Sequence, residues 1–148
     1  MNLKNLLKTN IELNLDSIFD ENGYINKNDK KMYGYNNFVK KITLYRSKTS
    51  TIKIGDDFLR NCEKLSSLDL SGLSNVTQIG DYFLDGCLNL SSLDLTPLSN
   101  VTQIGNFFLS GCSNLSNLDL SPLSNVTQIG YNFLWGCSNL SSLDLSPL

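Results

Sequence analysis

The sequence predicts an α/β solenoid, a fold in which a short unit of chain repeats and each copy stacks on the one before. The stretch LSNVTQIG occurs three times, letter for letter, at 73–80, 98–105 and 123–130. The cysteines recur with one period, since 25 residues separate each from the next: Cys62, Cys87, Cys112 and Cys137. A fixed period of 20 to 50 residues indicates a solenoid or a repeat array.

Each unit is predicted to begin with a short strand. Leu93 and Leu95 flank Asp94 in one copy. Because side chains alternate along a strand, these leucines should point inward and the aspartate outward. A turn at 99–100 should then lead to a second extended piece at 101–104.

The remainder of the unit is predicted to form a single helical turn at 106–109. Asn106 is placed to cap this turn, and Gly111 lies where a helix end favours a left-handed residue. Pro97 and Pro122 fall between the predicted strands, where a missing backbone donor costs little. One coil has too few apolar side chains to offset the entropy of ordering its backbone, so the coils should fold together.

The unit L-x-x-L-x-L followed by NVTQIG-x-x-F-L-x-G-C-x-N-L resembles the BspA-like subclass of leucine-rich repeats, over residues 39–148. The resemblance implies a right-handed leucine-rich-repeat solenoid of short parallel strands and short helical turns. It also implies a non-catalytic protein-binding or adhesion protein without a cofactor. Such proteins occur on the surfaces of bacteria and some protists, and in large DNA viruses.

The predicted array divides into a degenerate first coil at 39–64 and regular 25-residue coils at 65–148. Residues 1–38 do not repeat and are predicted to form an N-terminal cap. A hairpin is predicted there from IFDENGYI at 18–25, and a helix from the spacing of Leu3, Leu6, Leu7 and Ile11. The last unit stops within LDLSPL without a polar cap. Either the array continues beyond this sequence or its open end pairs with another chain.

Charge is divided unevenly along the chain. All 12 Lys and Arg lie within residues 4–64, whereas the coils from Leu65 onward hold six Asp and no cation. A basic head on an acidic body favours self-association into homodimers or longer assemblies, as an alternative to binding an unrelated protein. The sequence shows no classical signal peptide and no membrane-spanning stretch. The default expectation is therefore the cytoplasm, of the source cell or of a host cell, without membrane insertion.

Two columns of chemically distinctive side chains run through the repeats. The cysteines are predicted to form a buried row of reduced thiols, because stacked thiols run parallel and do not face one another. One outward strand position is always an aspartate: Asp69, Asp94, Asp119 and Asp144. Like charges about 5 Å apart repel, so this ladder needs hydrogen bonds from neighbouring groups or a bound cation. A calcium-dependent adhesin is therefore a further alternative.

The copies differ mostly in and beside the predicted helical turn. Variable positions on a constant scaffold indicate a recognition face, although relaxed constraint produces the same pattern. The candidate partner-binding residues are Asp81, Tyr82, Asp85, Leu88, Asn106, Phe107, Tyr131, Asn132 and Trp135. The Lys- and Tyr-rich stretch at 27–41 is expected to pack on the first coil, so nucleic acid is not predicted as a partner. No set of unlike polar groups predicts a catalytic site.

Overall fold

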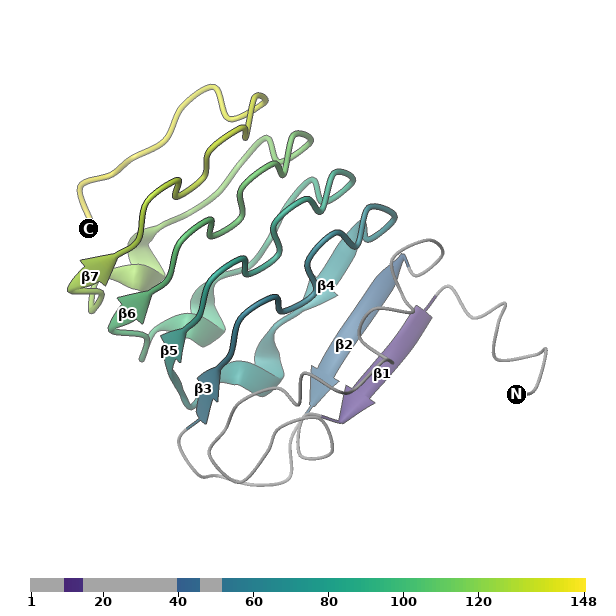
Figure 1. Cartoon of the computed structure of the whole chain (residues 1–148), viewed down its shortest axis with the longest axis horizontal. Coiled ribbons are helices and arrows are strands. Elements are labelled where there is room, and N and C mark those ends of the chain that lie inside the picture. The colour runs from purple at the N-terminus through teal and green to yellow at the C-terminus, as the bar shows by residue number, and fades with distance from the viewer. Residues whose placement is uncertain (1–9, 15–39, 46–51) are drawn as a thin grey trace.

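The computed structural model of the protein describes residues 10–14, 40–45 and 52–148, and consists of a stack of coils (Figure 1). Within these residues the strands form two sheets. The first has the order β1 (Asn10–Asn14), β2 (Lys41–Tyr45) and β4 (Ser67–Asp69). The second has the order β3 (Ile52–Ile54), β5 (Val76–Ile79), β6 (Gln103–Ile104) and β7 (Gln128–Ile129). Every pairing is parallel, which confirms a repeat solenoid of short parallel strands.

The register of the second sheet places identical residues side by side. Gln78 pairs with Gln103, and Gln103 pairs in turn with Gln128. Neighbouring strands are therefore one 25-residue unit apart in sequence. Because this shift is the same from coil to coil, each column of the aligned repeats becomes a physical row of side chains along the stack.

The described N-terminal segment continues the first sheet. Strand β1 pairs in parallel with β2, with Ile11 opposite Ile42 and Leu13 opposite Leu44. The prediction that Ile11 belongs to a helix is therefore wrong, because the Ile-x-Leu alternation fits the strand period of two. The other three residues of that predicted helix and the predicted hairpin at 18–25 lie outside the described residues. The predicted boundary of the cap at residue 38 stays a prediction.

The short helices of the repeat follow the Leu-Asp-Leu segment of each unit. This segment forms a strand, β4, before the first helix, but the predicted strand at Leu93–Leu95 is wrong because residues 91–95 are not paired as a strand, although Leu93 and Leu95 are buried and Asp94 is exposed as predicted. The helices are one-turn 3-10 helices at equivalent positions: η1 (Ser71–Leu73), η2 (Thr96–Leu98) and η3 (Ser121–Leu123). Pro97 and Pro122 lie in the first turn of η2 and η3, where a backbone N–H would have no helical partner. The repeat thus contains short helical turns as predicted, but they lie at 96–98 and the equivalent positions and not at 106–109.

Residues 106–109, predicted to be helical, follow a different backbone path. Phe107 and Leu109 have positive φ angles of 59° and 52°, and Gly111 has 69°. Every second residue here has a left-handed backbone conformation, and the residues between them do not. Successive N–H groups therefore point to opposite sides of the coil. A helix would instead direct every N–H along its own axis.

These alternating N–H groups join each coil to both neighbours. The N–H of Phe107 donates to the carbonyl of Tyr131 in the following coil, at 2.9 Å. The N–H of Leu109 donates to the carbonyl of Phe83 in the preceding coil, also at 2.9 Å. Asn106 does not cap its own turn, since its side-chain oxygen accepts the N–H of Tyr131 at 3.0 Å. The predicted helical turn and its Asn cap are wrong because bonds between coils take the place of bonds within them.

The core lies between the two sheets and is built from rows of identical side chains. Phe58, Phe83 and Phe108 are fully buried, with ring centroids 5.4 and 5.2 Å apart and nearly parallel planes. The leucines of the strands pack around this stack. Phe83 and Phe108 are each covered by a ring on both faces, so the burial of an inner ring depends on having a neighbouring coil on both sides.

Candidate functional site

The cysteines form a structural row, as predicted. All four carry thiols and none takes part in a disulfide. The Sγ of Cys112 donates a hydrogen bond to the carbonyl of Leu84 in the preceding coil, at 3.3 Å, and Cys87 makes the same bond to Leu59. Burial raises the pKa of Cys62 and Cys112 to about 12. These thiols stay protonated near neutral pH and are therefore poor nucleophiles.

The aspartate ladder makes local hydrogen bonds. One side-chain oxygen of each aspartate accepts the backbone N–H two residues later at 2.9 Å, in four equivalent pairs: Asp69 with Ser71, Asp94 with Thr96, Asp119 with Ser121, and Asp144 with Ser146. The backbone N–H of Ser71 lowers the pKa of Asp69, and hydrogen bonds from Thr96 lower that of Asp94. Among the described residues, no three His, Cys, Asp or Glu lie close enough together to hold a metal. This ladder thus makes a short hydrogen-bonded turn in every coil, in line with the hydrogen-bonded alternative, and at Asp69, Asp94 and Asp119 the turn leads into a 3-10 helix.

A second row of polar side chains holds the coils together. Asp56 accepts the backbone N–H of Asp81 at 2.8 Å, and Asp81 accepts that of Asn106 at 2.7 Å. Asn106 then accepts the N–H of Tyr131 at 3.0 Å. Two of the candidate recognition residues, Asp81 and Asn106, therefore have a demonstrable structural task. The first three members of this column, Asp56, Asp81 and Asn106, all supply a carbonyl-type oxygen, whereas the fourth, Tyr131, does not.

An aromatic row, defined as Tyr82, Phe107 and Tyr131, combines two neighbouring columns of the repeat. Tyr82 and Phe107 are equivalent residues of the next variable column, whereas Tyr131 is the last member of the column that contains Asp81 and Asn106. The rings of Tyr82 and Phe107 stack, with centroids 4.8 Å apart and planes 11° from parallel. Tyr131 meets Phe107 edge to face, with centroids 5.3 Å apart. The ring faces of Tyr82 and Phe107 are thus largely covered by neighbouring side chains of the row, whereas Tyr131 is 65% exposed.

Arg60 closes the N-terminal end of this row. Its guanidinium carbon lies 3.8 Å from the centroid of the Tyr82 ring. Its Nη1 and Nε lie 3.0 Å from oxygens of Asp57 and Asp85, respectively. The candidate residue Asp85 is therefore occupied by an ion pair. Sequence reasoning did not select Arg60, although the presence of an arginine where other copies have Asp, Ser or Trp was a visible signal.

The other candidate residues are more isolated. Trp135 is 65% exposed, Leu88 is 41% exposed, and Asn132 is also exposed. Within the described residues, no side-chain hydrogen bond or ring contact connects them to the aromatic row. The structure therefore brings together Tyr82, Asp85, Phe107 and Tyr131 and leaves the remaining three as separate surface positions.

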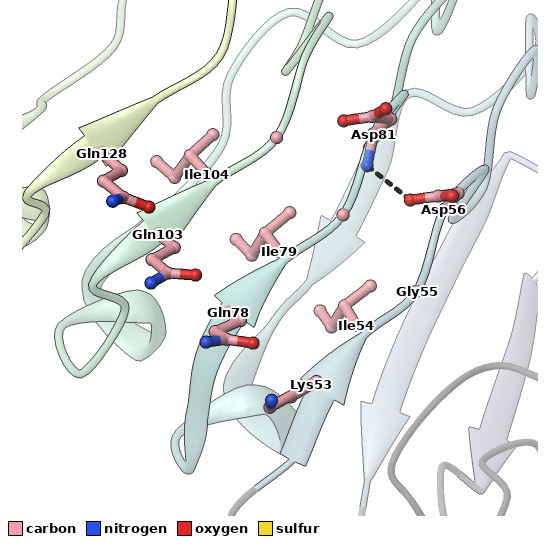
Figure 2. Close-up of a pocket in the computed structure, with 12 residues that line it drawn as sticks. Lys53, Ile54, Gly55, Asp56, Gln78, Ile79, Asp81, Gln103, Ile104 and Gln128 are labelled. Atoms are coloured by element: carbon pink, nitrogen blue, oxygen red, sulfur yellow. Dashed lines mark hydrogen bonds between the residues drawn. The ribbon is translucent and has the colours of Figure 1, made fainter.

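A groove that sequence reasoning missed lies along the second sheet. It has a volume of about 330 Å³ and crosses all four strands, lined by Lys53, Ile54, Gly55, Asp56, Gln78, Ile79, Gly80, Asp81, Gln103, Ile104, Gly105 and Gln128. Figure 2 shows the lysine and the glutamines in one row and the isoleucines in a second, with one residue of each row per coil. The signal in the sequence was a glutamine repeated at a solvent-facing position two residues before a repeated glycine.

Comparison with known proteins identifies a repeat family. The family model described as "BspA type Leucine rich repeat region" matches residues 26–147 in six copies. The match begins ahead of residue 39, the predicted start of the array. No curated protein and no solved structure matches the chain. None of the helices in the described part of the chain has the length and apolar character needed to cross a bilayer.

Proposed function

Because the chain belongs to the BspA-type leucine-rich repeat family, we propose that it is a protein-binding or adhesion scaffold without a catalytic role. The family is generally a non-enzymatic scaffold, and the site chemistry is consistent with this. The thiols are buried and protonated, and the aspartate ladder is engaged in local turns. The stack holds its surface rows in fixed register, which lowers the entropy cost of binding.

The exposed aromatic side chains carry this proposal. Tyr131 and Trp135 are each 65% exposed, which is unusual for residues of their size. Tyrosine and tryptophan are enriched among the residues that dominate binding energy at protein interfaces. The coils from Leu65 onward hold six Asp and no cation. The proposed partner is therefore a protein with an apolar patch surrounded by Lys or Arg side chains.

A paired-variant binding experiment tests the proposal. The wild-type chain and a Tyr131→Ser/Trp135→Ser variant would be passed over immobilised cell-surface and extracellular-matrix proteins in surface plasmon resonance. Saturable binding to at least one protein is expected, and the variant should bind it at least about tenfold more weakly, the loss expected for a hot-spot residue. A Ser91→Ala/Ser92→Ala variant, altered on the other side of the coil, should bind like wild type. Equal binding by all three chains, or no saturable binding, would contradict the proposal.

A second candidate function is self-assembly, favoured by the apolar surface of the last described coil. Ile129 and Leu145 are 40% and 57% exposed, whereas their counterparts Ile104 and Leu120 are 3% and 2% exposed. A second copy could cover this surface in an isologous dimer. Sedimentation over a concentration series would then show a dimer that persists in high salt, and Ile129→Lys would weaken it.

Salt separates this dimer from the head-to-body alternative. Contacts between the basic head and the acidic coils would weaken as salt rises, because screening acts on exposed charges. An apolar contact would not weaken. A monomer at every concentration and salt level would count against both forms of assembly.

A further inference from the structure

The groove along the second sheet is lined by polar side chains, isoleucines and glycines, and is called here the Gln–Gly groove. One wall is the row Lys53, Gln78, Gln103 and Gln128, and the other is formed by Asp56 and Asp81. The groove runs across the strands, and therefore along the stack. A ligand that fits it must be long and must repeat at about the spacing between strands, which is about 4.8 Å.

The glutamines differ from other repeated polar side chains near this sheet, because their side chains make no hydrogen bond between the described coils. Asn100 donates from its side chain to the carbonyl of Ser74 at 2.9 Å, and Thr102 donates to the carbonyl of Thr77 at 3.2 Å. No described residue exchanges a hydrogen bond with the side-chain amides of Gln78, Gln103 or Gln128. These amides are solvent-accessible and identical in chemistry, and there is one in each of three successive coils.

The glycines of this row allow the coils to stack closely. A Cβ atom on Gly105 would lie 2.5 Å from Oδ1 of Asp81 and 2.5 Å from the carbonyl carbon of Gly80, so the preceding coil already fills the space beside this glycine. Close stacking of the coils therefore requires glycine in this row. The row contributes backbone and no side chain to the lining of the groove.

We propose that the Gln–Gly groove binds a neutral, linear polysaccharide that lies along the stack, with about one sugar unit per coil. A primary amide offers two N–H donors and a carbonyl acceptor, which matches the paired hydroxyl groups of a sugar ring. Asp56 adds an acceptor for a hydroxyl group on the opposite wall, since one of its oxygens accepts the N–H of Asp81 and the other does not, whereas both oxygens of Asp81 already accept from Asn106.

An extended peptide fits this groove less well. Peptides added to sheets bind through main-chain groups at a strand edge, whereas here the N–H groups of Gly80 and Gly105 already donate to Ile54 and Ile79, at 2.7 and 2.8 Å. The side chains on one face of an extended peptide repeat at about 6.6–6.8 Å, which does not match the spacing of the coils. A strongly anionic polymer is disfavoured as well, because Lys53 is opposed by two carboxylates.

Titration with defined oligosaccharides tests the proposal. Cellohexaose is the probe, because it is neutral, linear and extended, and maltohexaose is the control, because it has the same composition but a curved chain. Calorimetry and amide NMR titration should show saturable binding of cellohexaose, with shifts centred on strands β5, β6 and β7, and weaker binding of maltohexaose. A Ser- and Gly-containing hexapeptide serves as the third probe.

A triple variant, Gln78→Ala/Gln103→Ala/Gln128→Ala, should reduce affinity for cellohexaose by at least about tenfold, since each lost hydrogen bond removes a small share of the binding energy. Its unfolding midpoint should stay unchanged, because the amides make no bond within the described fold. The matched control is Ser91→Ala/Ser92→Ala/Ser116→Ala, which removes three exposed polar groups outside the groove.

Two results would overturn the proposal: no saturable binding of cellohexaose, or equal binding by the wild-type and triple-variant chains. Binding of the hexapeptide in its place would assign the groove to peptides. The glutamine variant leaves Tyr131 and Trp135 intact, so the failure of this proposal is distinguishable from failure of the protein-binding function.

Discussion

The stretches 98–105 and 123–130 have the same sequence but different surroundings. Ile104 is 3% exposed, whereas Ile129, the same letter one unit later, is 40% exposed. The contrast is larger after the aspartate ladder position, where Leu120 is 2% exposed and Leu145 is 57% exposed. An inner coil is covered on both flanks and the last described coil on one. Burial in this molecule is therefore a property of the neighbouring coil and not of the local sequence.

The largest expected effect comes from removing an aromatic ring from an inner coil. Phe108 stacks on Phe83 and on Phe133, at 5.2 and 5.4 Å, whereas among the described residues Phe133 stacks on Phe108 alone. Phe108→Ala should lower the free energy of unfolding by about 3–5 kcal/mol, the usual cost of such a cavity. Phe133→Ala should cost clearly less, because its site is only half-buried. Urea unfolding followed by circular dichroism measures both.

Equal losses in the two variants would show that the last coil is covered to the same extent as the inner ones in solution. That result would support assembly through the apolar surface at Ile129 and Leu145. Repeating the measurement over a range of protein concentrations separates the two cases, because the stability of an assembled form rises with concentration.

The reactivity of the thiols also compares an inner coil with the last described coil. Cys112 is fully buried and Cys137 is only partly buried. Iodoacetamide should therefore modify Cys137 first, with a rate at least about tenfold above that of Cys112, because thiolate character and access together control the reaction. Peptide mapping after timed quenching measures each rate. Similar rates for the two thiols in the folded chain would contradict the difference in burial.

The thiols also predict the effect of alkaline pH. Burial raises the pKa of Cys62 and Cys112 to about 12 in the folded chain, compared with about 8.5 in an unfolded chain. The folded state therefore holds these protons more tightly. The stability contributed by the thiols is complete below pH about 8.5 and declines as the pH rises towards 12. Urea midpoints measured from pH 7 to pH 10 should fall, and replacing Cys112 with Ala should reduce the slope.

Much of the architecture could be predicted from the sequence because the repeat carries strong physical signals. The fixed period and the evenly spaced cysteines predicted parallel stacked coils and a row of thiols. The Leu-Asp-Leu alternation predicted which leucines of the inner coils are buried, although among these segments only β4 is a strand. The path at 106–111 could not be predicted in this way. Leu109 and Phe107 adopt positive φ angles, which propensity disfavours for such residues, and only Gly111 gave a local signal.

The candidate site was predicted in part, because chemical variation alone does not separate recognition from structure. The aromatic residues Tyr82, Phe107 and Tyr131 were selected and do form one row. Asp81 and Asn106 were selected for the same reason, yet both join successive coils. The Gln–Gly groove was overlooked because its glutamines do not vary, and because a groove arises only when three coils are aligned.

A substitution in this joining row has a smaller expected effect. Asp81 accepts the backbone N–H of Asn106 at 2.7 Å, so Asp81→Leu should lower the free energy of unfolding by about 1–3 kcal/mol, the cost of an unsatisfied donor. Asp81→Asn is the matched control, since Asn106 already accepts the equivalent N–H with an amide oxygen. The control should retain most of the stability in urea unfolding. A larger loss for Asn than for Leu would assign the role to charge and not to hydrogen bonding.

The smallest effect is expected when calcium is added or removed. The aspartate ladder repeats in inner and last coils alike, and Asp94 and Asp144 each use one oxygen to accept a local N–H at 2.9 Å. Because backbone and side-chain hydrogen bonds already lower the pKa of both carboxyls, the ladder does not need a cation for its charge to be tolerated. Thermal unfolding in calcium and in EDTA should therefore give the same midpoint. Lowering the pH should instead reduce the unfolding midpoint. A carboxyl whose pKa is lower in the folded chain than in the unfolded chain stabilises the fold above pH about 3.9, and this stabilisation is lost as the pH falls through the folded pKa. A midpoint that rises with calcium concentration would reverse this assignment and support a calcium-dependent adhesin.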